Sequence, residues 1–338
     1  MRRDREPRAT PPGRRLHGAR LRGARAYIQA GMLLAGILGG ILAHAGDTLL
    51  RIGDSKGVYK ALLRASGELE HLPYAVEWAE FPATAPALEA LAAGAIDLRG
   101  SAAAPLIFSL ASGAQIKAIA VLHVDGPRAA EAILVLPNSP IHNVADLRGK
   151  RIGTNKGSVG HHLVLAALLK AGIPFDAVTI QYLLPADAKA ALGGGSVDAW
   201  STWDPYVSIA EVQDHLRPIV DGTDLPMTDG VLVSSSASIA AKRAQLQDFL
   251  QRWARAQAWA RRNPEVYAKI YSEQTGLPLE VSQLLVRHMD YEYTAIGDDD
   301  VLGHQRVADL YLKAGVIRQA VDMKDAFDRS VFAPAASH

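Results

Sequence analysis

A short polar segment with anion-binding chemistry lies near the middle of the chain, at residues 151–162 (RIGTNKGSVGHH). Ser158 suits the N-cap of the apolar helix expected after it, because its hydroxyl can accept from backbone N–H groups two or three residues on. Lys156 stands beside that helix N-terminus, where free N–H groups and the helix dipole favour negative charge. The residue order of a Walker phosphate loop is absent. The segment therefore indicates either an anion site or an ordinary turn before a capped helix.

The same pattern occurs twice, which favours the first interpretation. Residues 51–57 (RIGDSKG) match residues 151–157 (RIGTNKG) at five of seven positions. A second pair of segments follows at nearly the same offset, because Ile96-Asp97 and Val197-Asp198 each come shortly after an Ala-Leu pair and a glycine. Repeated units of this kind predict two similar α/β lobes. Ligands of open α/β sheets bind at the carboxyl ends of strands, so two such lobes predict a cleft between them.

Small and aromatic residues follow the two strands that end in the repeated aspartates. In the first repeat these are Gly100 and Ser101, and small residues let a ligand approach backbone N–H groups closely. In the second repeat Trp203 and Asp204 hold the equivalent place. Aromatic residues serve most often as core, so we expect Trp200 to be buried inside its strand. Trp203, further along, is expected to form an apolar wall for a ligand.

The residues that catalysis or metal binding would need are missing or badly spaced. His161 and His162 are adjacent, so on a helix they cannot face one metal together as residues four apart would. The acidic run at 298–300 lacks the glycine and closing glutamate of a calcium loop and predicts a helix N-terminus instead. There is no cysteine and no evident carboxylate pair. We therefore expect a binding protein without a metal or a cofactor, in which His161 faces the cleft and donates to an anion.

The charge distribution separates residues 1–45 from the rest of the chain. The full sequence has 36 Lys and Arg and 35 Asp and Glu, for a formal net charge of +1. Residues 1–45 contain nine arginines and two acidic residues, so the remainder carries a net charge of −6. A chain with that balance has no general attraction for nucleic acid or anionic lipid. Any anion that it binds must be held by local groups.

The N-terminal segment has the three parts of a secretory signal peptide. An arginine-rich region is followed by an apolar run at 26–42 and by Ala43-His44-Ala45, which predicts cleavage after Ala45 and a periplasmic protein. The apolar run is short for a stable membrane span, although a retained anchor is the alternative. The long basic region leaves the true start at Met1 or downstream, and Arg14-Arg15 leaves export by the Sec or the twin-arginine route open. Without cysteine, no lipid tether can follow the apolar run.

The periodicity of the remaining sequence alternates between strands and helices, as in an α/β fold. We expect lobe one to comprise residues 46–124 and 229–338, and lobe two residues 125–228. Apolar runs predict strands at 49–53, 76–81, 95–98, 116–124, 132–136, 178–183, 197–200 and 231–235. Helices are expected at 58–66, 86–93, 106–111, 185–192 and 301–314, with a mostly helical region from 238 onward.

Taken together, these residues resemble the aliphatic-sulfonate and taurine binding proteins that feed ABC importers. The resemblance covers residues 50–331 and is carried by the two Lys-Gly turns and by several short motifs. The most specific motifs are Pro185-Ala186-Asp187-Ala188, Val197-Asp198-Ala199-Trp200, Trp203-Asp204-Pro205-Tyr206 and Asp221-Gly222-Thr223-Asp224-Leu225. The resemblance implies a two-lobed type II periplasmic binding protein fold that closes on a sulfonate between the lobes. It also implies a monomer that delivers its ligand to an ABC permease in the inner membrane.

In proteins of this family, polar side chains and backbone N–H groups of the loops at these positions hold the sulfonate. Carried over to this sequence, the resemblance implies a ligand site made of Ser55, Lys56, Gly100, Ser101, Gly157, Ser158, His161, Trp203, Asp204 and Thr228. One departure concerns the loop after Asp97, where family members often have Ser/Thr-Gly-Asp. Here Gly100-Ser101 is followed by three alanines, which reduces the polar groups available to a ligand.

Two other functions remain open at this level. The same fold could bind another importer ligand, such as taurine, nitrate or an aromatic sulfonate. It is also related to thiamine-pyrimidine synthase enzymes, but that class depends on cysteine and is cytosolic, whereas this chain has no cysteine and a predicted signal peptide.

Overall fold

The computed structural model describes residues 49–332, apart from residues 56 and 125. The predicted signal peptide at 1–45 and the predicted site residue Lys56 lie outside this part of the chain. Within the part described, no helix combines the length and the apolar character needed to span a bilayer.

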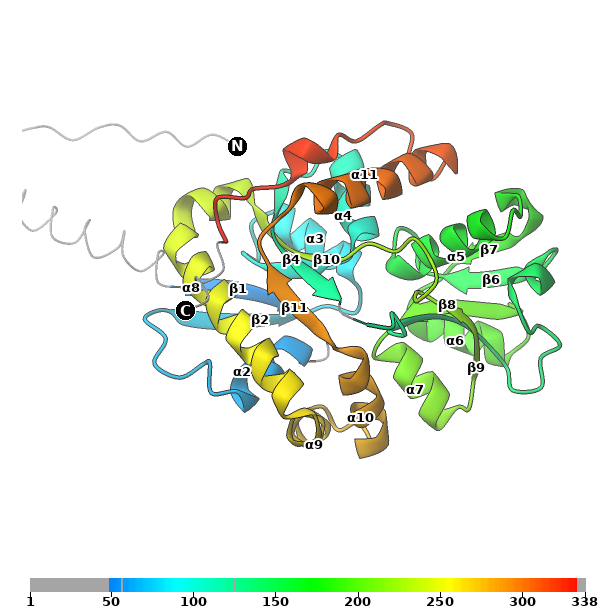
Figure 1. Ribbon diagram of the computed structural model, residues 1–338, viewed down its shortest axis with the longest axis horizontal. Helices are drawn as coiled ribbons and strands as arrows, with labels where there is room; N and C mark the ends of the chain where they lie inside the picture. The colour runs from blue at the N-terminus through cyan, green and yellow to red at the C-terminus, as the bar shows by residue number, and fades with distance from the viewer. Residues whose placement is uncertain (1–48, 56, 125, 333–338) are drawn as a thin grey trace, which may run out of the picture. The chain divides into compact units, whose positions relative to one another are not determined.

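A five-stranded sheet forms the centre of the region predicted as lobe two, in the order β7-β6-β8-β5-β9. β6 is parallel to β7 and β8, whereas β5 is antiparallel to β8 and β9. Helix α5 covers one face of the sheet, and α6 and α7 cover the other (Figure 1). The elements are β5 (Glu131–Val135), β6 (Arg151–Thr154), α5 (Val159–Lys170), β7 (Thr179–Tyr182), α6 (Pro185–Gly193), β8 (Ala199–Trp203), α7 (Tyr206–Gln213) and β9 (Arg217–Asp221).

The sequence of β5 explains why helices cover both faces of this sheet. Successive strand residues point to opposite faces. Ile133 and Val135 belong to the core beneath α5, and Ala132 and Leu134 belong to the core beneath α6 and α7. Trp200 lies in that second core with 1% of its surface exposed, which confirms its predicted place in the core.

The region predicted as lobe one has an equivalent arrangement. A four-stranded sheet has the order β11-β4-β10-β3, and a bridge between Ile52 and Leu98 joins β3 to the parallel pair β1-β2. The resulting order β2-β1-β3-β10-β4 matches β7-β6-β8-β5-β9, with one antiparallel strand fourth in each series. The strands are β1 (Leu49–Asp54), β2 (Ala75–Glu80), β3 (Arg99–Ser101), β4 (Ile116–Val124), β10 (Gly230–Ser235) and β11 (Tyr291–Thr294).

Helices cover both faces of the lobe-one sheet as well. One core contains α2, α8 and α9, and the other contains α3, α4 and α11. The predicted apolar stripe on α8, made of Leu246, Phe249, Leu250 and Trp253, is fully buried in the first core, which confirms that prediction. The helices are α2 (Val58–Ala65), α3 (Thr84–Ala92), α4 (Ala103–Ala111), α8 (Ser236–Arg262), α9 (Pro264–Thr275), α10 (Leu279–His288) and α11 (Asp298–Lys313), and short 3₁₀ segments lie at Val144–Leu147, Phe175–Ala177 and Met323–Ala326.

The sequence repeat is also a structural repeat. Asp97 accepts from the backbone N–H of Arg51 at 2.9 Å and from its guanidinium, and Asp198 does the same with Arg151 at 2.8 Å. In each lobe this pair joins the first strand to the start of the third. The matching residues therefore hold equivalent places in two similar α/β units.

The chain passes between the two regions twice, at residues 126–130 and 222–229. Arg128 ties the two segments together, because its backbone N–H donates to Thr223 Oγ1 at 3.1 Å and its guanidinium donates to the Thr228 carbonyl and pairs with Asp229. The strands before and after these segments belong to different sheets. We keep the lobe limits of 46–124 with 229–338, and 125–228, as a proposal.

The structure departs from the predicted elements at two equivalent strands. Strands were expected at 95–98 and 197–200, but β3 is Arg99–Ser101 and β8 is Ala199–Trp203. Gly100 and Ser101 have little preference for a strand, yet they pair with β10, which lies 130 residues further along the chain. β8 is extended in the same way by its pairing with β5. Helix α7 and strands β9 and β11 were not predicted, because they are short and depend on neighbours distant in sequence.

Candidate functional site

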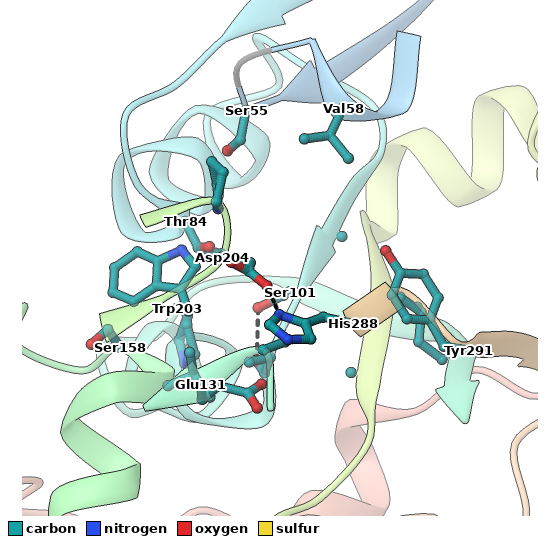
Figure 2. Close-up of a pocket in the computed structure, with 18 of the residues that line it drawn as sticks. Ser55, Val58, Thr84, Ser101, Glu131, Ser158, Trp203, Asp204, His288 and Tyr291 are labelled. Carbon is teal, nitrogen blue, oxygen red and sulfur yellow. Dashed lines mark hydrogen bonds and ion pairs between the residues drawn. The ribbon is translucent and has the colours of Figure 1, made fainter. Parts of the chain in front are cut away.

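A cavity of about 250 Å³ lies where the two lobes meet, lined by residues of both (Figure 2). This volume is slightly below the range of about 300–1,000 Å³ that is typical of sites for small organic molecules. Among the predicted site residues, those that line it are Ser55, Gly100, Ser101, Gly157, Ser158, Trp203, Asp204 and Thr228. His161 and Lys156 are not among the lining residues.

Arg99 is the principal charged donor of the cavity, and the sequence analysis missed it. Its side chain lines the cavity with 3% of its surface exposed. Nη2 donates to Ser55 Oγ at 2.7 Å, whereas the buried Nε and Nη1 have no hydrogen-bond partner. No carboxylate in the described part of the chain forms an ion pair with it. A buried guanidinium with two unused donors has the chemistry to bind an anion.

The sequence offered one indication of Arg99, because this residue directly precedes the predicted site residue Gly100. Its guanidinium carbon lies 5.9 Å from the centroid of the Tyr59 ring, within range of a cation–π contact. Gly100 makes room for this ring, because a Cβ at residue 100 would lie 2.3 Å from the Tyr59 hydroxyl oxygen. Gly100 thus permits the packing that fixes Arg99.

The two repeated turns differ in whether their helix N-terminus is open. In lobe one the buried carboxylate of Asp54 accepts from the backbone N–H groups of Ser55, Tyr59 and Lys60 at 2.7–3.1 Å. That carboxylate occupies the anion site of α2, so no ligand anion can take it. Thr154 replaces the aspartate in lobe two, which leaves α5 without such a carboxylate.

Ser158 caps α5 as predicted, since its hydroxyl oxygen accepts from the His161 N–H at 3.2 Å. The hydroxyl also donates to the Asn155 carbonyl at 2.6 Å, so its proton is already used within the turn. The donor that α5 presents to the cavity is therefore the backbone. Val159, the first helical residue, lines the cavity, and a backbone N–H at this position has no acceptor within the helix.

His161 does not take the place in the cleft that the sequence predicted. Its ring is fully buried, with Nδ1 accepting from the Gly157 N–H at 3.2 Å and its ring centroid 5.2 Å from that of Tyr182. Burial, with the nearby His162 and Lys156, lowers its pKa to about 4, so the ring is neutral near pH 7. His161 positions the turn before α5 rather than supplying charge to an anion.

Lys156 also turns away from the cavity. Its Nζ lies 5.7 Å from the centroid of the Phe108 ring and 5.5 Å from that of Tyr182. Gly157 allows lobe two to approach Phe108 of lobe one, because its φ is +68° and a Cβ there would lie 2.9 Å from the Phe108 ring. The Lys156-Gly157 turn of lobe two therefore packs against lobe one.

A second helix N-terminus, that of α4, faces the cavity from lobe one. The N-cap Ala102 makes no side-chain hydrogen bond, and both Ser101 and Ala102 line the cavity. With alanine at residues 102–104, the first-turn N–H groups of α4 are uncapped and open to close approach.

The rest of the lining is largely apolar. Trp203 is partly buried and meets Tyr206 edge-on, with ring centroids 6.0 Å apart. Both lobes contribute to this part of the wall, which includes Val58, Leu122, Trp203, Leu285, Met289 and Tyr291. Such a surface can bury the hydrocarbon part of a small ligand.

Asp204 joins lobe two to lobe one. Its Oδ2 lies 2.6 Å from Nδ1 of His288 on α10, and its Oδ1 accepts from the N–H and hydroxyl of Ser208 (Figure 2). Burial opposes charge on His288, but the hydrogen bond to Asp204 and the negative charges of Asp204 and Glu211 together outweigh it and raise the pKa of His288. Both oxygens of Asp204 are therefore engaged by the protein itself.

Further contacts join the lobes on either side of the cavity. The Tyr311 hydroxyl of α11 donates to the Ser158 carbonyl at 3.3 Å, and the Tyr206 hydroxyl donates to the Pro82 carbonyl at 3.4 Å. The lobes are thus in contact around the cavity.

A model of the NMT1/THI5-like family matches residues 75–266, which is more than half of the chain. A protein of Escherichia coli (strain K12), named an aliphatic sulfonates-binding protein, is 35% identical over 302 residues, which cover 87% of this chain and 94% of the relative.

Two solved structures are similar in sequence and in fold. The alkanesulfonate-binding protein SsuA from Xanthomonas axonopodis pv. citri, bound to MOPS, has a TM-score of 0.78 and 32% identity, covering 84% of this chain and 99% of that chain. The periplasmic aliphatic sulphonate binding protein SsuA from Escherichia coli has a TM-score of 0.75 and 34% identity, covering 86% of this chain and 95% of that chain.

Proposed function

Because the chain belongs to the NMT1/THI5-like family and, within it, to the aliphatic-sulfonate binding proteins, we propose that it captures aliphatic sulfonates in the periplasm and delivers them to an ABC importer. The likeness to the named relatives and the anion-binding cavity support this function. We further propose that the protein is exported with cleavage after Ala45, acts as a monomer, and binds its ligand without catalysis, metal or cofactor.

The observation that carries the proposal is the buried guanidinium of Arg99. A buried charge without a counter-ion is unfavourable, and an anion bound beside it relieves that state. Nε and Nη1 are free to donate, and the open N-termini of α4 and α5 add backbone donors from two lobes. A sulfonate fits this arrangement, since it is always ionised near pH 7 and has three acceptor oxygens for several donors.

The apolar wall favours a sulfonate with a carbon chain over an inorganic anion. Sulfate and nitrate can occupy the donors around Arg99 but leave the surface of Trp203 and its neighbours uncovered. Each methylene group that this surface buries adds about 0.8 kcal/mol to binding. The cavity of about 250 Å³ limits the ligand to a short chain.

Isothermal titration calorimetry with a series of linear alkanesulfonates tests this function, with sulfate and nitrate as comparison anions. Affinity should rise with chain length until the cavity is full, and both inorganic anions should bind weakly. A ligand at about a hundredfold excess over its Kd should stabilise the protein by about 2.7 kcal/mol in thermal unfolding. Failure of every sulfonate to bind, or nitrate binding as tightly as the best sulfonate, would contradict the proposal.

A further inference from the structure

The cavity contains a carboxyl group that the proposed sulfonate site does not use. Glu131 begins β5, directly opposite Trp203 in the antiparallel pair β5-β8, and its side chain lines the cavity. In Figure 2, Glu131 lies near the bottom of the view and Ser55, which accepts a hydrogen bond from Arg99, lies near the top. An anion beside Arg99 would therefore extend its tail toward Glu131.

The charged neighbours of Glu131 are already engaged elsewhere. Asp204 is bound by His288 and Ser208, and Arg128 by Asp229 and the Thr228 carbonyl. The side chain of Glu131 itself has no hydrogen bond or ion pair with any described residue. A half-buried carboxyl group that lines a ligand cavity and has no partner of its own is open to a group on the ligand.

We propose that Glu131 recognises a cationic amino group on the tail of the bound sulfonate, so that the cavity selects aminoalkanesulfonates over alkanesulfonates of equal length. This inference rests on the proposed function, and it adds a residue that contacts the end of the ligand opposite the sulfonate. The sulfonate meets Arg99, the methylene groups meet the apolar wall, and the ammonium group pairs with the carboxylate of Glu131.

The electrostatics of the site agree with this geometry. The pKa of Glu131 is raised to about 7, chiefly by burial; Arg128 and His288 lower this pKa, and Asp204 and Asp221 raise it. An ammonium group favours the ionised carboxylate, whereas a methyl group at the same place favours the neutral acid. Binding of the two kinds of ligand should therefore depend on pH in opposite directions.

Calorimetry with 3-aminopropane-1-sulfonate and butane-1-sulfonate tests the inference, since the two differ only by an ammonium group in place of a terminal methyl group. At about pH 8.5 the amino ligand should bind about 10- to 100-fold more tightly. Lowering the pH to about 5, two units below the pKa of Glu131, should weaken the amino ligand by up to ~100-fold and should not weaken the alkyl ligand.

Glu131→Gln keeps the size of the side chain and removes its charge, so it should abolish both the preference and the opposite pH dependence. Because His288 and Asp204 form an ion pair nearby, a matched control is needed. Glu211→Gln removes a half-buried carboxyl group of α7 that lies near both of them but does not line the cavity, and it should leave the preference intact.

The outcomes separate this inference from the proposed function. If neither ligand binds, both fail. If butane-1-sulfonate binds as tightly as the amino ligand at pH 8.5, or if Glu131→Gln keeps the preference, the inference is overturned while sulfonate binding stands.

Discussion

Replacing Arg99 by methionine should abolish ligand binding without lowering the stability of the ligand-free protein. Methionine is flexible and apolar, so it can fill the space of the arginine stem beside Tyr59. The change removes a guanidinium that has 3% exposure and no counter-ion among the described residues. We therefore expect a variant that loses its ligand but unfolds no more easily than the parent when no ligand is present.

The two unpaired nitrogens set the size of the effect on binding. A hydrogen bond to a charged group contributes about 1.5–3 kcal/mol, so losing those from Nε and Nη1 should weaken sulfonate binding by about 3–6 kcal/mol. This corresponds to about 10²- to 10⁴-fold in Kd. In the ligand-free protein, replacing a buried ionic group by an apolar one is often neutral or stabilising by about 1–4 kcal/mol. The lost bond to Ser55 and the lost contact with Tyr59 reduce that gain.

Calorimetry with butane-1-sulfonate and urea unfolding without ligand measure the two quantities. Arg151→Met is the matched control, since Arg151 pairs with Asp198 and does not line the cavity. Its side chain is 42% exposed, so its loss should lower stability by no more than about 1 kcal/mol and leave affinity unchanged. Arg99→Lys keeps the charge but loses the paired donors, and it should bind with intermediate affinity.

The reasoning fails if Arg99→Met binds butane-1-sulfonate as tightly as the parent protein. A large loss of stability in the ligand-free variant would refute the other half, because it would mean that the guanidinium has a counter-charge in the folded protein.

Further measurements test other parts of the site and of the chain. Ser158→Ala should lower stability to urea by about 1 kcal/mol through loss of the helix cap. Because the cap also holds the turn whose backbone N–H groups face the cavity, the change should reduce the affinity for all chain lengths alike; a loss that grows with chain length would contradict this. Trp203→Ala should flatten the increase of affinity with chain length, because each methylene group it covers contributes about 0.8 kcal/mol; equal losses at every length would mean that the indole only supports its lobe. Since the pKa of His288 is raised in the folded protein, its pairing with Asp204 stabilises fully below about pH 6.5 and is lost as the pH rises through the raised value. His288→Gln should therefore destabilise the protein more at pH 6 than at pH 9 in thermal unfolding. An equal effect at both pH values would show that the ion pair does not contribute to stability. Protein purified from the periplasm should begin at residue 46 in N-terminal sequencing, and an intact arginine-rich terminus would contradict cleavage after Ala45.

Local patterns determined the architecture and the neighbourhood of the site. The two matching turns, 51–57 and 151–157, predicted two α/β units, and both units have the same strand order with the same Arg–Asp pair. These features could be predicted because residues close in sequence form each strand, turn and capped helix. Eight of the ten predicted site residues line one cavity for the same reason, since the ends of neighbouring strands meet at one edge of a sheet.

Only the tertiary structure decided which of those groups is free to meet a ligand. Asp54 and Thr154 hold the same place in the repeat, yet Asp54 closes one helix N-terminus while the other stays open. Ser158 and Asp204 are polar residues at the cavity whose hydrogen bonds are taken by Asn155 and His288. Arg99 is left without a counter-ion because the fold brings no carboxylate of the described residues into an ion pair with it. The partner of Asp204 lies 84 residues away in the sequence, and no local pattern records that distance.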